Sequence, residues 1–259
     1  MPYALVTGAS KGIGKAIAEE LAQRNCNLLL IARSESLLQQ MAKDLTDKFS
    51  VQVNYLAIDL AIPSASEQIK NWLSENKYDI NILVNNAGYG LSGAFENNTA
   101  NDYRDMMQVN MNVPITLTHL LLPALKKQPK SHILNIVSSA AYQAVPGLTV
   151  YAASKSFMLS FSRGLQYELR NSTVAVTAVS PGGTSTDFAN RANLGEKAVK
   201  AGEKLNMTPA EVARLAVDAM FARKTETITG FINKLGAALV WLLPKKLAEK
   251  TAAGIYNID

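Results

Sequence analysis

Short apolar runs rich in β-branched residues alternate with longer segments of helical period from the first residues to about Ile228. Strands that stay apolar throughout, each followed by a helix, are typical of a parallel sheet covered on both faces. The pattern therefore predicts an α/β fold with a doubly wound parallel sheet. The expected strands are Ala4–Thr7, Leu28–Ala32, Val51–Ile58, Ile82–Asn85, Ile133–Ser138 and Val174–Ser180. The expected helices are Gly12–Arg24, Glu35–Phe49, Ser64–Asn76, Thr99–Leu122, Thr149–Arg170 and Pro209–Phe221.

Local signals place two of the helix starts. Ser64 and Glu67 have the spacing of a capping box, and Thr208 is followed by a first-turn proline and by Glu211 at the third helical position. No repeat or long linker divides the chain, and 259 residues with 48% hydrophobic content suffice for one core. We therefore expect a single domain over residues 1–259.

The composition argues against several classes of function. The net charge of +5 comes from lysines and arginines that are spread rather than clustered, so a nucleic-acid partner is not expected. Cys26 is the only cysteine, which suits a buried structural thiol in a reducing compartment. His119 and His132 are isolated, and we expect no metal. The start of the chain has no basic-then-apolar leader, so we expect a cytoplasmic location.

A glycine-rich turn joins the first expected strand to the first helix. Glycines at such a turn let the backbone approach a pyrophosphate, and the start of the helix supplies N–H donors and a favourable dipole. A glycine-rich turn without a ligand is the alternative, but its place between a strand and a helix in the first βα unit favours a dinucleotide site. The expected contacts are Gly8, Ser10, Lys11, Gly12, Ile13 and Gly14.

The end of the second strand predicts which dinucleotide is bound. An acidic residue at this place would accept the ribose hydroxyls of NAD, but the strand ends in Arg33. An arginine offers a fork of donors to a 2′-phosphate, and Lys11 could add a second cation on the same side. The sequence therefore favours NADP(H) over NAD(H).

Three polar side chains near the middle of the chain predict proton chemistry. Tyr151 and Lys155 share one face of a helix, and Ser138 ends an apolar run thirteen residues before the tyrosine. A cation beside a phenol favours the phenolate, so we expect Lys155 to lower the pKa of Tyr151. A Tyr-x-x-x-Lys pair alone would be an ordinary helix pair, but together with the dinucleotide site it indicates a general acid for carbonyl chemistry.

These motifs, in this order, resemble those of the short-chain dehydrogenase/reductase family, in its single-domain branch of about 250 residues. The resemblance runs to about Thr186 and implies a Rossmann fold and hydride transfer between nicotinamide and a carbonyl or alcohol carbon. It also adds cofactor-binding residues after three further strands. These are Asp59 and Leu60 after the third strand, Asn86, Ala87 and Gly88 after the fourth, and Pro181, Gly182, Thr184 and Thr186 after the sixth, together with Tyr151 and Lys155.

The resemblance implies four catalytic residues. Tyr151 donates a proton to the substrate oxygen, Lys155 lowers its pKa and binds the nicotinamide ribose, and Ser138 holds the substrate oxygen. Asn110 matches the asparagine that kinks a helix and holds a water in the proton path. Ser139 is the alternative to Ser138, and Asn112 is the alternative to Asn110. The family spacing selects Ser138, and the preceding valine favours Asn110.

The segments expected to contact the substrate are mostly apolar. Tyr89–Asn98 and Ala140–Thr149 favour an apolar ketone, aldehyde or alcohol over a sugar. Residues 187–205 resemble a mobile lid. Its cations could meet an anionic handle such as a CoA or acyl-carrier phosphate, but we expect them to form a solvated helix face instead. The apolar residues among them are Tyr89, Leu91, Phe95, Tyr142, Val145, Pro146 and Leu148, and the cations of the lid are Arg191, Lys197, Lys200 and Lys204.

Residues 230–259 form an amphipathic tail that could cover the pocket, pack in a subunit interface or touch a membrane surface. We expect the first two roles rather than the third. The family suggests a homodimer or homotetramer. Two rivals to an enzyme of this kind are a catalytically silent NADP-binding regulator and an epimerase or dehydratase of the longer family branch. The four catalytic residues argue against the first, and the glycine spacing argues against the second.

Overall fold

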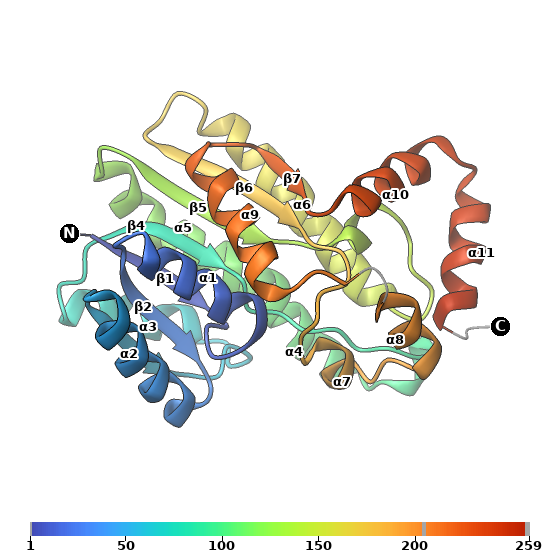
Figure 1. Cartoon of the computed structure of the whole chain (residues 1–259), viewed down its shortest axis with the longest axis horizontal. Coiled ribbons are helices and arrows are strands. Elements are labelled where there is room, and N and C mark those ends of the chain that lie inside the picture. Colours follow the sequence, from blue (N-terminus) through green and yellow to red (C-terminus); the bar gives the residue numbers. More distant parts are fainter. Residues whose placement is uncertain (1, 204–205, 257–259) are drawn as a thin grey trace.

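The computed structural model describes residues 2–203 and 206–256. In this part of the chain seven parallel strands form one sheet in the order β3-β2-β1-β4-β5-β6-β7 (Figure 1). The order reverses between β1 and β4, which is where a doubly wound sheet opens a crevice for a ligand. The strands are β1 (Tyr3–Thr7), β2 (Asn27–Ala32), β3 (Val53–Ala57), β4 (Ile80–Asn85), β5 (Ser131–Ile136), β6 (Val174–Ser180) and β7 (Glu226–Ile228).

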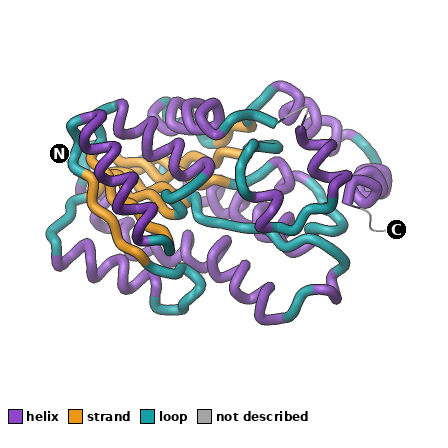
Figure 2. The backbone as a smooth tube through the Cα atoms, turned by 60° about the horizontal axis from the view of Figure 1, so that its bottom comes forward, coloured by secondary structure: helices purple, strands orange, loops and turns teal. Residues whose placement is uncertain are grey.

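Helices cover both faces of the sheet (Figure 2). One apolar core lies between the sheet and α1, α2 and α9, and a second lies between the sheet and α3, α5 and α6. Continuously apolar strands explain this arrangement, because each strand buries side chains on both faces. The helices are α1 (Gly12–Gln23), α2 (Glu35–Phe49), α3 (Ala65–Glu75), α4 (Ala100–Met107), α5 (Val113–Lys127), α6 (Thr149–Glu168), α7 (Phe188–Arg191), α8 (Glu196–Glu203), α9 (Pro209–Phe221), α10 (Phe231–Leu242) and α11 (Lys245–Tyr256).

The doubly wound fold is confirmed, and several local predictions are corrected. The helix expected over Thr99–Leu122 is divided by a π-helical turn at Gln108–Asn112. The Ser64 side chain makes no capping bond to the backbone and instead accepts a hydrogen bond from Gln68, so the capping box expected there is wrong. The box at Thr208 and Glu211 does form. Strand β7 was not expected, because a run of three residues is too short to show a strand period.

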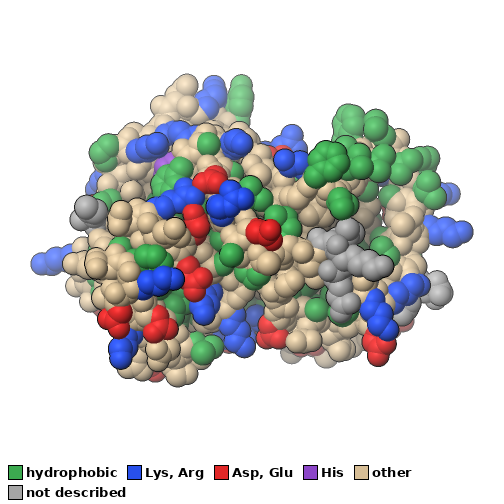
Figure 3. Space-filling model, viewed as in Figure 1, with side chains coloured by type: hydrophobic (Ala, Val, Ile, Leu, Met, Phe, Trp, Pro, Cys, Tyr) green, Lys and Arg blue, Asp and Glu red, His purple; other side chains and the backbone are tan. Residues whose placement is uncertain are grey.

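Two helices at the end of the described chain project from the sheet (Figure 1). Helix α10 has no buried residue, and Figure 3 shows apolar side chains gathered over this projecting part. Helix α11 folds back toward the body of the molecule and buries Ala248 and Ala252. Among the described residues no helix is both long enough and apolar enough to cross a bilayer.

Candidate active site

The glycine-rich turn after β1 is held in a conformation that side chains would disrupt. Gly8 and Gly12 have φ values of +65° and +54°, in the left-handed region that favours glycine. A Cβ on Gly8 would lie 2.8 Å from the Cα of Ala87, and a Cβ on Gly14 would collide with the Asn86 side chain and the Gly8 carbonyl. The turn therefore lies directly against the loop after β4, with the start of α1 facing the crevice between them. This cradle fits a dinucleotide pyrophosphate.

The loop after β4 is fixed to the glycine turn by a dense set of hydrogen bonds. Thr7 Oγ1 accepts from the backbone N–H groups of Asn86 at 3.0 Å and Ala87 at 3.1 Å, and it donates to the carbonyl of Val84 at 3.1 Å. Asn86 Nδ2 donates to the Thr7 carbonyl at 2.9 Å. These bonds join the first and fourth βα loops across the point where the strand order reverses.

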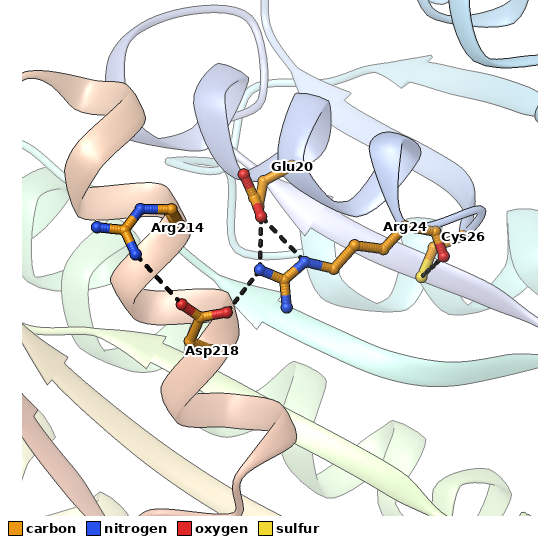
Figure 4. A network of polar contacts seen from close by, with 5 residues as sticks. All are labelled: Glu20, Arg24, Cys26, Arg214 and Asp218. Carbon is orange, nitrogen blue, oxygen red and sulfur yellow. Dashed lines mark hydrogen bonds and ion pairs between the residues drawn. The ribbon is translucent and has the colours of Figure 1, made fainter.

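Helix α1, which begins at the glycine turn, is also fixed at its other end (Figure 4). Arg24 Nη2 lies 2.6 Å from both Glu20 of the same helix and Asp218 of α9, and Arg214 approaches Asp218 at 3.6 Å. Partly exposed ion pairs of this kind contribute only about 1 kcal/mol or less each. Their effect here is mainly to orient the end of α1 against α9.

A cavity of about 550 Å³ runs along the carboxyl ends of the strands. It brings together nearly all of the residues that the sequence predicts for the cofactor and for catalysis. Ser10 and Asn110 do not line it, although Asn110 lies just behind Gly88. The predicted residues that do line it are Gly8, Lys11, Gly12, Ile13, Gly14, Arg33, Asp59, Leu60, Asn86, Ala87, Gly88, Ser138, Tyr151, Lys155, Pro181, Gly182, Thr184 and Thr186.

One end of the cavity is basic. Arg33 follows β2 and is exposed, and the Nζ of Lys11 lies 3.6 Å from Asp187 on the segment after β6. Arg191, also from that segment, stacks its guanidinium 4.3 Å from the centre of the Tyr89 ring. Burial, and then the nearby Arg33, lower the pKa of Arg191. Two guanidinium groups therefore line the cavity near each other, in a field that suits a bound anion.

The other end of the cavity holds the three polar groups of the Tyr-x-x-x-Lys motif and its serine. Tyr151 and Lys155 lie on α6, are 8% and 5% exposed, and have the Nζ of the lysine 5.8 Å from the centre of the tyrosine ring. Ser138 follows β5 and lines the cavity with Tyr151, and its Oγ accepts a hydrogen bond from the backbone N–H of Ala140 at 3.1 Å. Lys155 Nζ donates to the carbonyl of Ile136 at 3.0 Å. Ser139 lines the cavity too, and its backbone N–H donates to the Pro181 carbonyl at 2.7 Å.

Burial dominates the electrostatics of this group. It raises the pKa of Tyr151 to about 12, against the opposing effect of the Ser138 hydrogen bond. It lowers the pKa of Lys155 to about 8. The prediction that Lys155 lowers the pKa of Tyr151 therefore does not hold in this structure, because desolvation outweighs any effect of the ammonium, which is bonded to a backbone carbonyl instead.

Asn110 lies in the π-helical turn and is 1% exposed. Its side-chain amide accepts from the N–H of Tyr89 at 3.1 Å, donates to the carbonyl of the same residue at 2.9 Å and donates to Ser154 at 3.1 Å. A Cβ on Gly88 would lie 3.1 Å from Asn110 Oδ1 and 3.3 Å from Lys155 Nζ. Asn110 thus joins the loop after β4 to α6 behind the lysine, whereas Asn112 is exposed and bonds only to Gln108 among the described residues.

Comparison with known proteins agrees with this geometry. A family model described as short chain dehydrogenase matches residues 2–197, most of the chain. The chain belongs to this family. The expected resemblance to the short-chain dehydrogenase family is therefore confirmed.

Relatives of this short-chain dehydrogenase span several kinds of protein. Very-long-chain 3-oxoacyl-CoA reductase of Mus musculus is 35% identical over 72% of this chain and 61% of that protein. Hydroxysteroid dehydrogenase-like protein 1 of Gallus gallus is 35% identical over 69% of this chain and 54% of that protein. The alignments thus span only a little over half the length of these relatives. A solved short-chain dehydrogenase from Sphingobium yanoikuyae in complex with NADPH has a TM-score of 0.82 and 31% identity, covering 93% of this chain and 94% of that one.

All three segments expected to contact the substrate contribute residues to the apolar cluster around Tyr151, although not every expected side chain reaches the cavity. Of the seven apolar residues expected to contact the substrate, Leu148 lines the cavity, whereas Phe95 is 63% exposed and the hydroxyl of Tyr142 bonds to Glu226 and Ser180. Five further apolar residues line the cavity from the two segments that the sequence offered as a lid, 187–205, and as a possible pocket cover, 230–259, although the sequence did not single out these residues. Lys204 lies outside the described residues. The five residues are Phe188, Leu194, Val199, Ile255 and Tyr256.

Proposed function

We propose that this short-chain dehydrogenase uses NADP(H) to interconvert an apolar ketone or aldehyde and its alcohol. One observation carries the proposal: a single cavity has a glycine cradle and Arg33 at one end, and the Ser138, Tyr151 and Lys155 side chains at the other. A dinucleotide cofactor has its phosphates and its reactive ring far apart, and this cavity offers complementary groups at both places.

The proton chemistry follows from the burial of the candidate acid. When bound, the nicotinamide supplies a hydride to the carbonyl carbon or accepts one from the alcohol carbon. Tyr151, with its pKa raised to about 12, stays protonated at neutral pH and can donate its phenolic proton to the carbonyl oxygen during reduction. Ser138, which lines the cavity with Tyr151, holds the same oxygen, and Lys155 lies beside the ring as a cation below its pKa of about 8.

The preference for NADP(H) rests on the basic end of the cavity. Arg33 stands where an acidic residue would accept ribose hydroxyls, and an arginine fork matches a 2′-phosphate. The related Sphingobium yanoikuyae protein was solved in complex with NADPH, which supports the same choice here.

The substrate class rests on the wall beside the candidate acid. The ring of Phe188 lies 5.2 Å from that of Tyr151, and Leu148 and Tyr256 join the same apolar cluster. Apolar walls favour a substrate whose carbonyl carries hydrocarbon on at least one side. A mouse relative that acts on very long acyl chains is consistent with such a substrate.

Turnover on a graded panel tests the proposal. We would follow consumption of NADPH and of NADH with small sugars, aliphatic aldehydes, steroid ketones and long-chain 3-oxoacyl thioesters. The proposal expects NADPH-dependent reduction of at least one apolar member and none of the sugars. Tight NADPH binding with no turnover on the whole panel would favour the silent regulator.

Tyr256 provides a test of how the tail affects substrate size. Tyr256→Ala would open the apolar wall, and we expect the ratio of kcat/KM for long and short substrates to change by roughly ten-fold, the effect of one or two methylene contacts. Tyr167→Ala is the matched control, since Tyr167 is 69% exposed on α6 and does not line the cavity. An unchanged ratio in Tyr256→Ala would contradict the role of the tail.

A further inference from the structure

Helix α10 exposes an unusual amount of apolar surface. The apolar face consists of Phe231, Ile232, Leu235, Trp241, Leu242 and Leu247, from α10 and the first turn of α11. Each of these side chains is at least half exposed, with Phe231 at 80% and Trp241 at 83%. Figure 3 shows the corresponding apolar side chains gathered on the projecting part of the molecule. A soluble helix normally buries such residues against its own protein.

Within the described residues, little packing holds α10 against the rest of the protein. Its 12 residues include none that are buried, and a helix of this length is marginal in water without packing. Asn233 anchors its first turn by donating to the Thr229 carbonyl at 2.8 Å. The cavity gives no further role to α10, because the lining residues from the described tail, Ile255 and Tyr256, both belong to α11. Some other surface is needed to cover the apolar face.

The charges around the apolar face indicate what kind of partner covers it. From Thr227 to Ala248 the sequence has no aspartate or glutamate, but it has Lys234 in α10 and Lys245 and Lys246 where α11 begins. An isologous contact with a second copy would bring these lysines toward their own equivalents, with Glu226 and Glu249 at the two ends of the segment as the nearest carboxylates. A sheet of anionic lipid headgroups is instead complementary to the lysines, while its acyl region accepts the apolar side chains.

We propose that α10 and the start of α11 dock this protein on the surface of an anionic lipid bilayer. The helix lies in the plane of the headgroups, because it is too short to span the hydrocarbon, with Trp241 at the interfacial level where indole rings concentrate. The same tail supplies Ile255 and Tyr256 to the cavity wall, so docking places the apolar end of the site near the bilayer. The docking does not depend on the proposed reaction.

Vesicle binding by the whole chain tests the docking directly. Trp72 and Trp241 are the two tryptophans, so a Trp72→Phe protein reports Trp241 emission alone. We would titrate this protein with phosphatidylcholine vesicles and with vesicles that also contain phosphatidylglycerol. The proposal expects a blue shift and co-sedimentation with the anionic vesicles, weakened by high salt. Equal binding to both kinds of vesicle, or binding to neither, would overturn it.

Two sets of variants separate the parts of the docking surface. Losing both charges in Lys245→Gln/Lys246→Gln should weaken binding to anionic vesicles roughly thirty-fold, whereas Lys126→Gln/Lys127→Gln, an exposed lysine pair of α5, should not change it. Trp241→Ser should weaken binding by roughly ten-fold or more. If Trp241→Ser instead converts a dimer to a monomer by light scattering and vesicles do not bind, a second copy covers the apolar face and the proposal is wrong.

Discussion

Replacing Lys155 by methionine should stabilise the protein without its cofactor. The lysine is 5% exposed, and burial lowers its pKa from 10.5 to about 8. Since one pKa unit is worth about 1.4 kcal/mol, the folded state is destabilised by roughly 3 kcal/mol when the ammonium is charged. Methionine has a similar length and no charge, but it leaves the Ile136 carbonyl without its hydrogen bond, a loss of about 1 kcal/mol. We expect a net gain of about 2 kcal/mol at pH 7.

The stability difference between Lys155→Met and the wild type should change with pH. The unfolded chain keeps the lysine proton up to pH 10.5, whereas the folded protein loses it near pH 8. The free energy of unfolding of the wild type therefore rises between these two values as the penalty on the charged form disappears. Over the same range the advantage of Lys155→Met should fall from about 2 kcal/mol to a deficit of about 1 kcal/mol, because only the lost hydrogen bond remains.

Urea unfolding of the wild type and of Lys155→Met between pH 7 and pH 11 measures this difference. Other titrating groups affect both proteins equally and cancel. Lys43→Met, at an exposed position of α2, is the matched control. Its free energy of unfolding should differ from that of the wild type by the same amount at every pH. A Lys155→Met protein that is less stable than wild type at pH 7, by an amount independent of pH, would refute the reasoning.

Two further predictions concern the cofactor end and the support behind the lysine. Arg33→Asp should weaken NADPH binding by roughly ten- to a hundred-fold and leave NADH binding unchanged. Fluorescence titration measures both affinities, with Lys43→Asp as the control variant. Equal losses of affinity for both cofactors would contradict a 2′-phosphate contact. Asn110→Ala should lower the free energy of unfolding by about 2 kcal/mol or more, because the buried Asn110 amide loses its two hydrogen bonds to the Tyr89 backbone. Asn112→Ala, at an exposed position, should leave the free energy of unfolding measured with urea nearly unchanged. A similar loss in both variants would argue against the special role of Asn110.

The sequence predicted the parts of the site that depend on short-range patterns. Glycine spacing, the strand ends and the i, i+4 pair of Tyr151 and Lys155 each act within one βα unit, and the doubly wound sheet brings their loops to one crevice. Phe188 and Tyr256 reach the same cavity from segments whose course depends on tertiary packing. The sequence offered these segments as a lid and as a possible pocket cover, but nothing in their local period singles out Phe188 and Tyr256 as the residues that reach the site.

The pKa of Tyr151 shows a second limit of the sequence. The spacing of tyrosine and lysine on a helix indicated that the cation would lower the phenol pKa. The structure buries both groups and directs the ammonium to the Ile136 carbonyl, so burial raises the pKa of Tyr151 to about 12. Sequence spacing gives proximity on a helix, but it does not give the solvent exposure that decides the sign of the shift.

The central claim is that Tyr151 is the proton donor. The most direct test compares Tyr151→Phe with the wild type in two measurements, the affinity for NADPH and the turnover of the best apolar substrate. Tyr142→Phe is the matched control, because the Tyr142 hydroxyl bonds to Ser180 and Glu226 away from the cavity. We predict that Tyr151→Phe binds NADPH as the wild type does but loses turnover by about 10²-fold or more, while Tyr142→Phe keeps it. Wild-type turnover in Tyr151→Phe would contradict the account.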